Sequence, residues 1–86
     1  MKHLIISFNS RNSLYAFAKI LRSNNISVSI INTPRSIAIS CGLSIKTNFI
    51  HLNLISNLIK QVNISGFIGI FIQTSNNSLQ RYEKFM

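Results

Sequence analysis

Cys41 is the only thiol in a chain of 86 residues, and the residues around it could give that thiol a chemical role. A cysteine thiolate is a strong nucleophile, and its ordinary pKa of about 8.5 falls when a cation or hydrogen-bond donors stabilise the anion. Arg35 is the nearest cation before it in the sequence, and Ser40 can donate a hydrogen bond. This arrangement predicts a thiol that a sulfur atom of a partner can approach.

Two residues constrain the backbone on either side of this stretch. Pro34 fixes its own φ and restricts Thr33 to extended conformations, so the chain leaves the preceding strand in a defined direction. Gly42 permits a backbone geometry that other residues avoid and leaves space beside the thiol. The predicted site is therefore Cys41 as the reactive residue, with Thr33, Pro34, Arg35, Ser40 and Gly42 as the residues that bind around it.

The same residues have a plainer interpretation. A free cysteine is among the most buried residue types and commonly serves as inert packing. In that case Arg35 is a solvated loop charge, and Pro34 and Gly42 serve backbone geometry alone. Both interpretations of Cys41 stay open at this point.

The few possible metal ligands predict that the chain holds neither a metal nor a cofactor. A single cysteine excludes an intrachain disulfide framework, and with only His3 and His51 besides, it excludes a closed zinc site within one chain. Cys41 and the histidines show no recognisable ligand spacing. We expect His51 to be a half-buried structural residue at the start of a helix.

The charge of the chain favours anionic partners in general but does not locate a binding groove. The formal net charge is +8, because the basic residues are balanced by a single acid, Glu83. These basic residues are dispersed along the chain. The apolar run at Leu4–Ile6 is too short for a signal peptide, and no run approaches the roughly 18 residues of a membrane span. A lone thiol suits a reducing compartment, so we expect a cytoplasmic protein without membrane contact.

Hydrophobic periodicity predicts four strands and two helices. Apolar residues in β-branched or alternating runs predict strands over residues 3–8, 26–30, 42–46 and 67–72. Apolar stripes with helical spacing predict amphipathic helices over 11–23 and 52–62. Ser10 is a plausible N-cap for the first helix, and Thr47 or Asn48 can cap the segment before the second.

The order β-α-β-β-α-β predicts an α+β fold of the ferredoxin-like type, an antiparallel four-stranded sheet with two helices on one face. This domain spans residues 1–73, and the Ser/Asn-rich residues 74–86 are expected to form a flexible polar tail. The opposite sheet face is expected to stay open. The predicted inner layer consists of Leu4, Ile6, Phe8, Val28, Ile30, Leu43, Ile45, Ile68 and Ile70.

The connection between the second and third strands is longer than the tight hairpin usual in this fold. It runs from Asn32 to Ser40, directly before Cys41. Enlarged loops on rigid scaffolds often carry functional sites. The predicted fold therefore places the thiol where a loop joins a strand.

Within this connection, Thr33-Pro34-Arg35, Ile37 and Ser40-Cys41-Gly42, followed by an apolar strand, resemble the signature of the putative selenium/sulfur (Se/S) carrier protein-like family of small bacterial domains. The likeness runs from the opening strand that ends in Phe8 to the strand near Ile72. The Ser/Asn-rich tail from Thr74 and the scarcity of Glu and Lys depart from the family pattern.

The resemblance implies a ferredoxin-like domain that holds sulfur or selenium on Cys41 as a persulfide or selenopersulfide. It further implies two partners, a donor such as a cysteine desulfurase and an acceptor enzyme. Such a protein is a carrier rather than a stand-alone enzyme.

Two other functions remain as alternatives. The first is a non-catalytic interaction or dimerisation module in which Cys41 only packs, and an apolar patch of Ile5, Ile31, Phe67 and Phe71 would suit a homodimer or another partner. The second is an RNA-binding module, because this topology also builds RNA-recognition motifs with exposed aromatic residues on their central strands. The predicted central strands carry no such aromatics, which makes nucleic acid an unfavoured partner.

Overall fold

The computed structural model describes residues 2–37, 42–76 and 79–86. The predicted α+β class is confirmed, because two α-helices accompany a five-stranded antiparallel sheet. The elements follow one another as β1 (Lys2–Phe8), α1 (Arg11–Ser23), β2 (Ser29–Asn32), β3 (Leu43–Asn48), the 3-10 helix η1 (Phe49–His51), α2 (Leu52–Gln61), β4 (Phe67–Asn76) and β5 (Leu79–Lys84).

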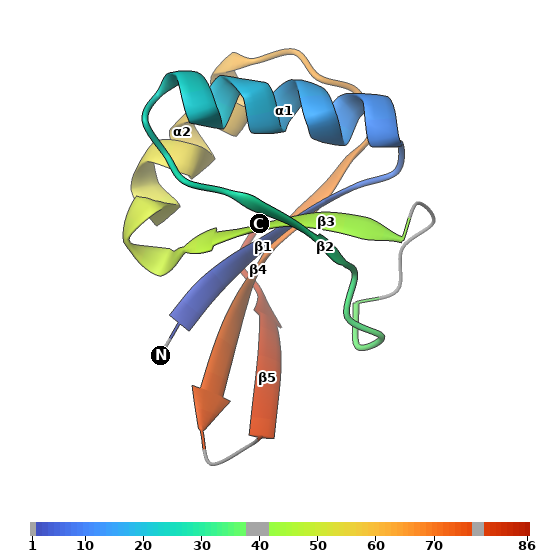
Figure 1. Ribbon diagram of the computed structural model, residues 1–86, viewed down its shortest axis with the longest axis vertical. Coiled ribbons are helices and arrows are strands. Elements are labelled where there is room, and N and C mark those ends of the chain that lie inside the picture. The colour runs from blue at the N-terminus through green and yellow to red at the C-terminus, as the bar shows by residue number, and fades with distance from the viewer. Residues whose placement is uncertain (1, 38–41, 77–78) are drawn as a thin grey trace.

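The sheet has the strand order β2-β3-β1-β4-β5, and both helices lie on one of its sides (Figure 1). The prediction of four strands is wrong, because β5 pairs with β4 from Phe71 to Asn76. The predicted boundary at residue 73 falls inside β4. Beyond β5, the Phe85 N–H donates to the Ile70 carbonyl at 2.7 Å, so the end of the chain also follows β4. As a result, β4 is not an edge strand.

The first helix begins and ends where its sequence predicts. The Ser10 hydroxyl caps the first turn by accepting from the Ser13 N–H at 3.2 Å. At the other end, Asn25 adopts a positive φ of 61°, and the Ile26 N–H donates back to the Leu21 carbonyl at 3.0 Å. This is a Schellman motif, in which the residue after the cap packs on the last turn. Because Ile26 belongs to this cap, β2 begins at Ser29 rather than at the predicted residue 26.

The main core lies between the helices and the sheet face that they cover, here called the helix face. Phe8 is fully buried in it, and the centroid of its ring lies 5.6 Å from that of the Phe17 ring. Burial of such side chains contributes roughly 1.5–3 kcal/mol each relative to exposure. The buried members of the core are Leu4, Ile6, Phe8, Leu14, Phe17, Ala18, Leu21, Ile26, Ile45, Ile55 and Ile70.

A register shift in β4 changes one predicted core position. Ser7 pairs with Gly69 but Phe8 pairs with Phe67, so Ile68 is an extra residue opposite this step in β1. A bulge of this kind reverses which residues face the core. Phe67, predicted to lie on the outer face, packs instead on the helix face, with its ring 5.8 Å from that of Phe8. The predicted placement of Ile68 in the inner layer is therefore wrong.

The sheet face opposite the helices, here called the far face, is not open as predicted. Residues directly opposite in antiparallel strands share a face, so Ile5 and Ser7 of β1 lie on the far face with Ser44 of β3. All three are fully buried. The predicted apolar patch of Ile5, Ile31, Phe67 and Phe71 is therefore wrong, since Ile5 is covered and Phe67 faces the helices.

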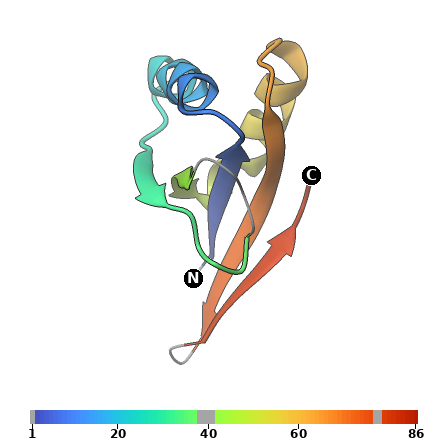
Figure 2. The same ribbon diagram turned by 90° about the vertical axis from the view of Figure 1, so that its right-hand side faces the viewer.

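The β2–β3 connection supplies part of the cover on the far face. Residues 33–37 leave β2 on the side of the sheet away from α1, as the two views show (Figures 1 and 2). Ile37 is only 4% exposed, yet it lies outside the main core cluster. Residues 33–37 of the connection thus pack against the sheet instead of extending from it. No helix of the described residues is long and apolar enough to cross a membrane.

Candidate functional site

The connection that contains the predicted thiol is closed at its base by a backbone hydrogen bond. The Thr33 N–H donates to the Gly42 carbonyl at 2.8 Å. It continues the ladder of the β2–β3 pair, whose last partners are Asn32 and Leu43. The two ends of the loop are therefore held side by side by strand pairing.

A tight turn shapes the first half of the connection. The Ile37 N–H donates to the Pro34 carbonyl at 2.9 Å, which folds the four residues from 34 to 37 into a β-turn. Pro34 is the first residue of this turn and supplies its carbonyl acceptor. The turn buries Ile37 and leaves Arg35 and Ser36 exposed.

Three hydroxyl groups attach the start of the loop to the middle of the sheet. The Thr33 Oγ1 lies 2.7 Å from the Ser44 Oγ, which in turn lies 3.0 Å from the Ser7 Oγ. Ser7 and Ser44 are fully buried, so each needs a hydrogen-bond partner within the protein. The hydroxyl chain, as we call these three residues, joins the Thr-Pro-Arg tripeptide to β3 and β1.

Gly42 adopts the left-handed conformation that its sequence position predicts. Its φ is +76°, a region that side chains with a Cβ rarely adopt. A Cβ placed there would have no described neighbour within 4 Å. Glycine is thus required by the backbone angle at this position and not by a lack of room.

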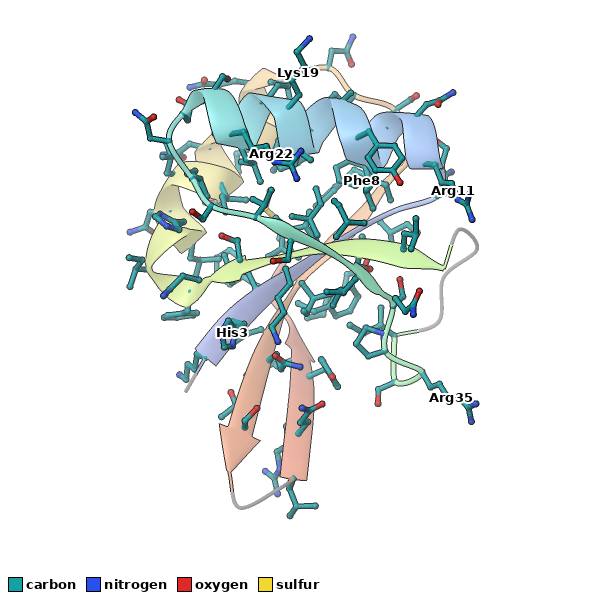
Figure 3. All side chains as sticks on the ribbon, viewed as in Figure 1. His3, Phe8, Arg11, Lys19, Arg22 and Arg35 are labelled. Carbon is teal, nitrogen blue, oxygen red and sulfur yellow. The ribbon has the colours of Figure 1, made fainter. Side chains whose placement is uncertain are left out.

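The predicted site residues separate into three groups. Thr33 and Gly42 meet through the bond at the loop base, and Pro34 supplies the carbonyl of the turn. Arg35 lies on the turn and its side chain points outward from the molecule (Figure 3). Ser40 and Cys41 lie outside the described residues, so their relationship to Arg35 stays a prediction.

The sequence analysis missed the residues that hold the loop in place. Ser7 follows the apolar run of β1, Ser44 lies between Leu43 and Ile45 of β3, and the two serines are direct partners in the β1–β3 register. The two serines can be recognised as partners only when the register of the strands is known. Ile37, an apolar residue in a predicted loop, is a signal in the sequence.

Few groups suited to metal binding gather in this structure. Within the described residues, no cluster of three or more His, Cys, Asp or Glu side chains could hold a metal ion. His51 is partly buried in η1. His3 lies at the start of β1 on the far face, and burial together with the charge of Lys46 lowers its pKa below the ordinary 6.5.

Comparison with known proteins shows the family of this chain. A family model described as putative Se/S carrier protein-like matches residues 3–67. The chain belongs to this family. No curated protein and no solved structure matches it.

The part of this Se/S carrier protein-like chain that matches the family includes the whole candidate site. It starts within β1 and takes in the loop from Thr33 to Gly42. It ends at Phe67, the first residue of β4, so β5 lies beyond the matched region.

Proposed function

We propose that the protein carries sulfur or selenium on Cys41, as a persulfide or selenopersulfide, between a donor and an acceptor enzyme. The family description supports the sulfur or selenium cargo. The observation that carries the proposal is the 2.8 Å hydrogen bond from the Thr33 N–H to the Gly42 carbonyl, because it anchors the loop that contains the only cysteine of the chain.

The loading step is a thiol exchange that needs no external oxidant. The Cys41 thiolate attacks the outer sulfur of a persulfide on the donor, a new S–S bond forms to Cys41, and the S–S bond of the donor breaks. The donor cysteine leaves as a thiolate and the outer sulfur keeps its oxidation level. Unloading repeats the exchange with the acceptor as the nucleophile.

Arg35 contributes to this exchange through its charge. Its guanidinium lies on the exposed side of the turn, in the same loop as Cys41. A nearby cation stabilises a thiolate and the anionic terminal atom of a persulfide. At an exposed position this effect is screened by salt over about 8–10 Å.

The remaining chemistry belongs to the partners. We propose a cysteine desulfurase or a related transferase as the donor, in the reducing environment of the cytoplasm. The chain itself serves as a carrier and not as a stand-alone enzyme, because the bonds to the original sulfur source are broken elsewhere. A second copy of the chain is a further proposed partner.

The rate at which Cys41 reacts with iodoacetamide separates this function from a structural role of the thiol. Cys41 is the only cysteine, so alkylation reports on this residue alone. We expect the folded protein at neutral pH to react at least as fast as the protein unfolded in urea. A folded protein that reacts many times more slowly than the unfolded chain would favour the interaction module, in which Cys41 only packs.

A further inference from the structure

A second feature of the far face is a hollow toward the end of β3 that is remote from the loop. Its volume is about 450 Å³, within the range of roughly 300–1,000 Å³ typical of small-molecule sites. The hollow extends from the start of β1 across β3 to β2. Its lining includes His3, Ser29, Ile31, Lys46 and Asn48.

The charge in this hollow is positive and lacks a neighbouring acid. Lys46 of β3 stands directly opposite Ser29 of β2 and carries the ammonium group of the lining. Glu83 is the only acidic side chain of the whole chain. It pairs with Ile72, a residue that packs against the main core, so it belongs to the helix face of the sheet. An anion is therefore the natural counter-charge for Lys46.

His3 adds a polar atom whose bonding is incomplete. Its Nδ1 is buried, and no hydrogen-bond partner for it exists among the described residues. A buried polar atom without a partner is unfavourable, so such atoms in native structures call for an explanation. His3 also lines the hollow, so a rotation of its ring would bring this atom to a ligand bound there.

The neighbours of His3 along the same row of the far face do not bond to its Nδ1. Asn48 on β3 accepts the Ile50 N–H through its Oδ1 at 2.9 Å. Gln73 on β4 donates its amide to the Tyr82 hydroxyl at 3.0 Å. Both are uncharged, so the charges that act on His3 are those of Lys46 and the amino end of the chain.

We propose that this hollow binds a small organic anion whose carboxylate or phosphate group lies between Lys46 and His3. Lys46 supplies a charge-assisted hydrogen bond, which is stronger than a neutral one. Ser29 offers a hydroxyl donor, and Ile31 provides an apolar wall for the rest of the ligand. This inference does not depend on the carrier function, because none of these residues belongs to the loop.

Two histidines make the proposal testable by NMR. The side-chain resonances of His3 and His51 are followed during titrations with inorganic phosphate and with benzoate, each against sodium chloride at equal ionic strength. We expect the His3 resonances to move and saturate with phosphate, benzoate or both, while those of His51 stay in place. The anion that saturates identifies the head group. Bound anion also raises the pKa of His3, because it opposes the effect of Lys46.

Matched variants test the role of the lysine. Lys46→Gln should weaken binding about tenfold, the loss expected for one charge-assisted hydrogen bond, and Lys46→Arg should retain most of the affinity. Lys19→Gln is the control, since Lys19 lies on α1 on the opposite side of the molecule (Figure 3). Cys41→Ala should bind as the wild type does, which separates this site from the carrier site.

Three results would overturn the proposal. The first is a change in the His3 resonances that sodium chloride reproduces in full. The second is an equal loss of affinity in the Lys46→Gln and Lys19→Gln variants. The third is the absence of any saturable response to either anion.

Discussion

The side-chain oxygens of Thr33 and Ser44 lie 2.7 Å apart and join the first residue of the Thr-Pro-Arg tripeptide to a buried position on β3. Ser44 also contacts Ser7 of β1 at 3.0 Å. A loop that is tied to two strands in this way keeps a defined position over the sheet. The hydroxyl chain thus holds the start of the loop, at Thr33, against the far face.

Removing the middle hydroxyl of this chain should destabilise the protein. In Ser44→Ala, the hydroxyls of Thr33 and Ser7 both lose a partner, and Ser7 is fully buried. We expect the free energy of unfolding to fall by about 1–3 kcal/mol, as measured by urea denaturation. Ser36→Ala, at an exposed position of the same turn, should change it by less than about 0.5 kcal/mol. Equal effects of the two substitutions would contradict the role given to the hydroxyl chain.

Alanine should act differently at the two glycines with positive φ. Gly42→Ala forces a Cβ into the left-handed region but into open space, so we expect a loss of about 1 kcal/mol. Gly66→Ala carries the same strain at φ +84° and also brings its Cβ against the side chain of Asn9. Its loss in urea denaturation should be larger by at least about 1 kcal/mol. A Gly42→Ala variant as unstable as Gly66→Ala would show that the loop end is more crowded than the structure indicates.

Arg35 should influence reactivity without influencing stability. Its side chain is exposed, so Arg35→Ala is expected to change the free energy of unfolding by less than about 0.5 kcal/mol. The alkylation rate of Cys41 at neutral pH should fall about two- to fivefold in low salt, and the difference should shrink as salt screens the charge. Lys19→Ala serves as the control for a loss of one positive charge elsewhere. Identical rates in both variants would remove Arg35 from the proposed site.

His3 should make the stability of the fold depend on pH. Its pKa in the folded state is lowered, first by burial and then by Lys46, so the unfolded chain binds the proton more readily. The free energy of unfolding should therefore decrease as the pH falls from about 6.5 through the lowered pKa of the folded state. Urea denaturation at a series of pH values should show a smaller decrease for His3→Gln. A slope unchanged by this substitution would contradict the lowered pKa.

Local signals in the sequence predicted most of the helix layer. Ser10, the apolar stripe and the asparagines at 24 and 25 bound α1 as the structure has it. The apolar stripe also predicted α2, and the alternation of apolar and polar residues predicted β3. These features depend on residues close in sequence, which is why periodicity reveals them.

The features that the sequence did not reveal depend on pairing between distant segments. The fifth strand forms through backbone hydrogen bonds to β4, although its side chains show no apolar alternation. The bulge opposite Ser7 places Phe67 rather than Ile68 on the helix face. A shift of register by one residue leaves no mark on the sequence itself. The hydroxyl chain needs the same register before Ser7 and Ser44 are seen as partners.

In the candidate site too, the features set by neighbouring residues were predicted and those set by distant segments were missed. Thr33, Pro34 and Gly42 were predicted from residue type, and their backbone roles follow from proline geometry and a positive φ. Ile37 was missed as an anchor, because nothing local shows that a loop folds back over a sheet. The chemical role of Cys41 depends on the family resemblance and stays a proposal.

Sulfur loading, measured by intact-protein mass spectrometry, tests the central claim most directly. The wild type and Cys41→Ala are incubated with a cysteine desulfurase and cysteine, and the desulfurase is then removed. We predict that the wild type gains the mass of one sulfur atom, which a reducing agent removes, and that the folded Cys41→Ala variant gains none. Equal sulfur uptake by the two proteins, or no uptake by the wild type with any persulfide donor, would contradict the carrier function.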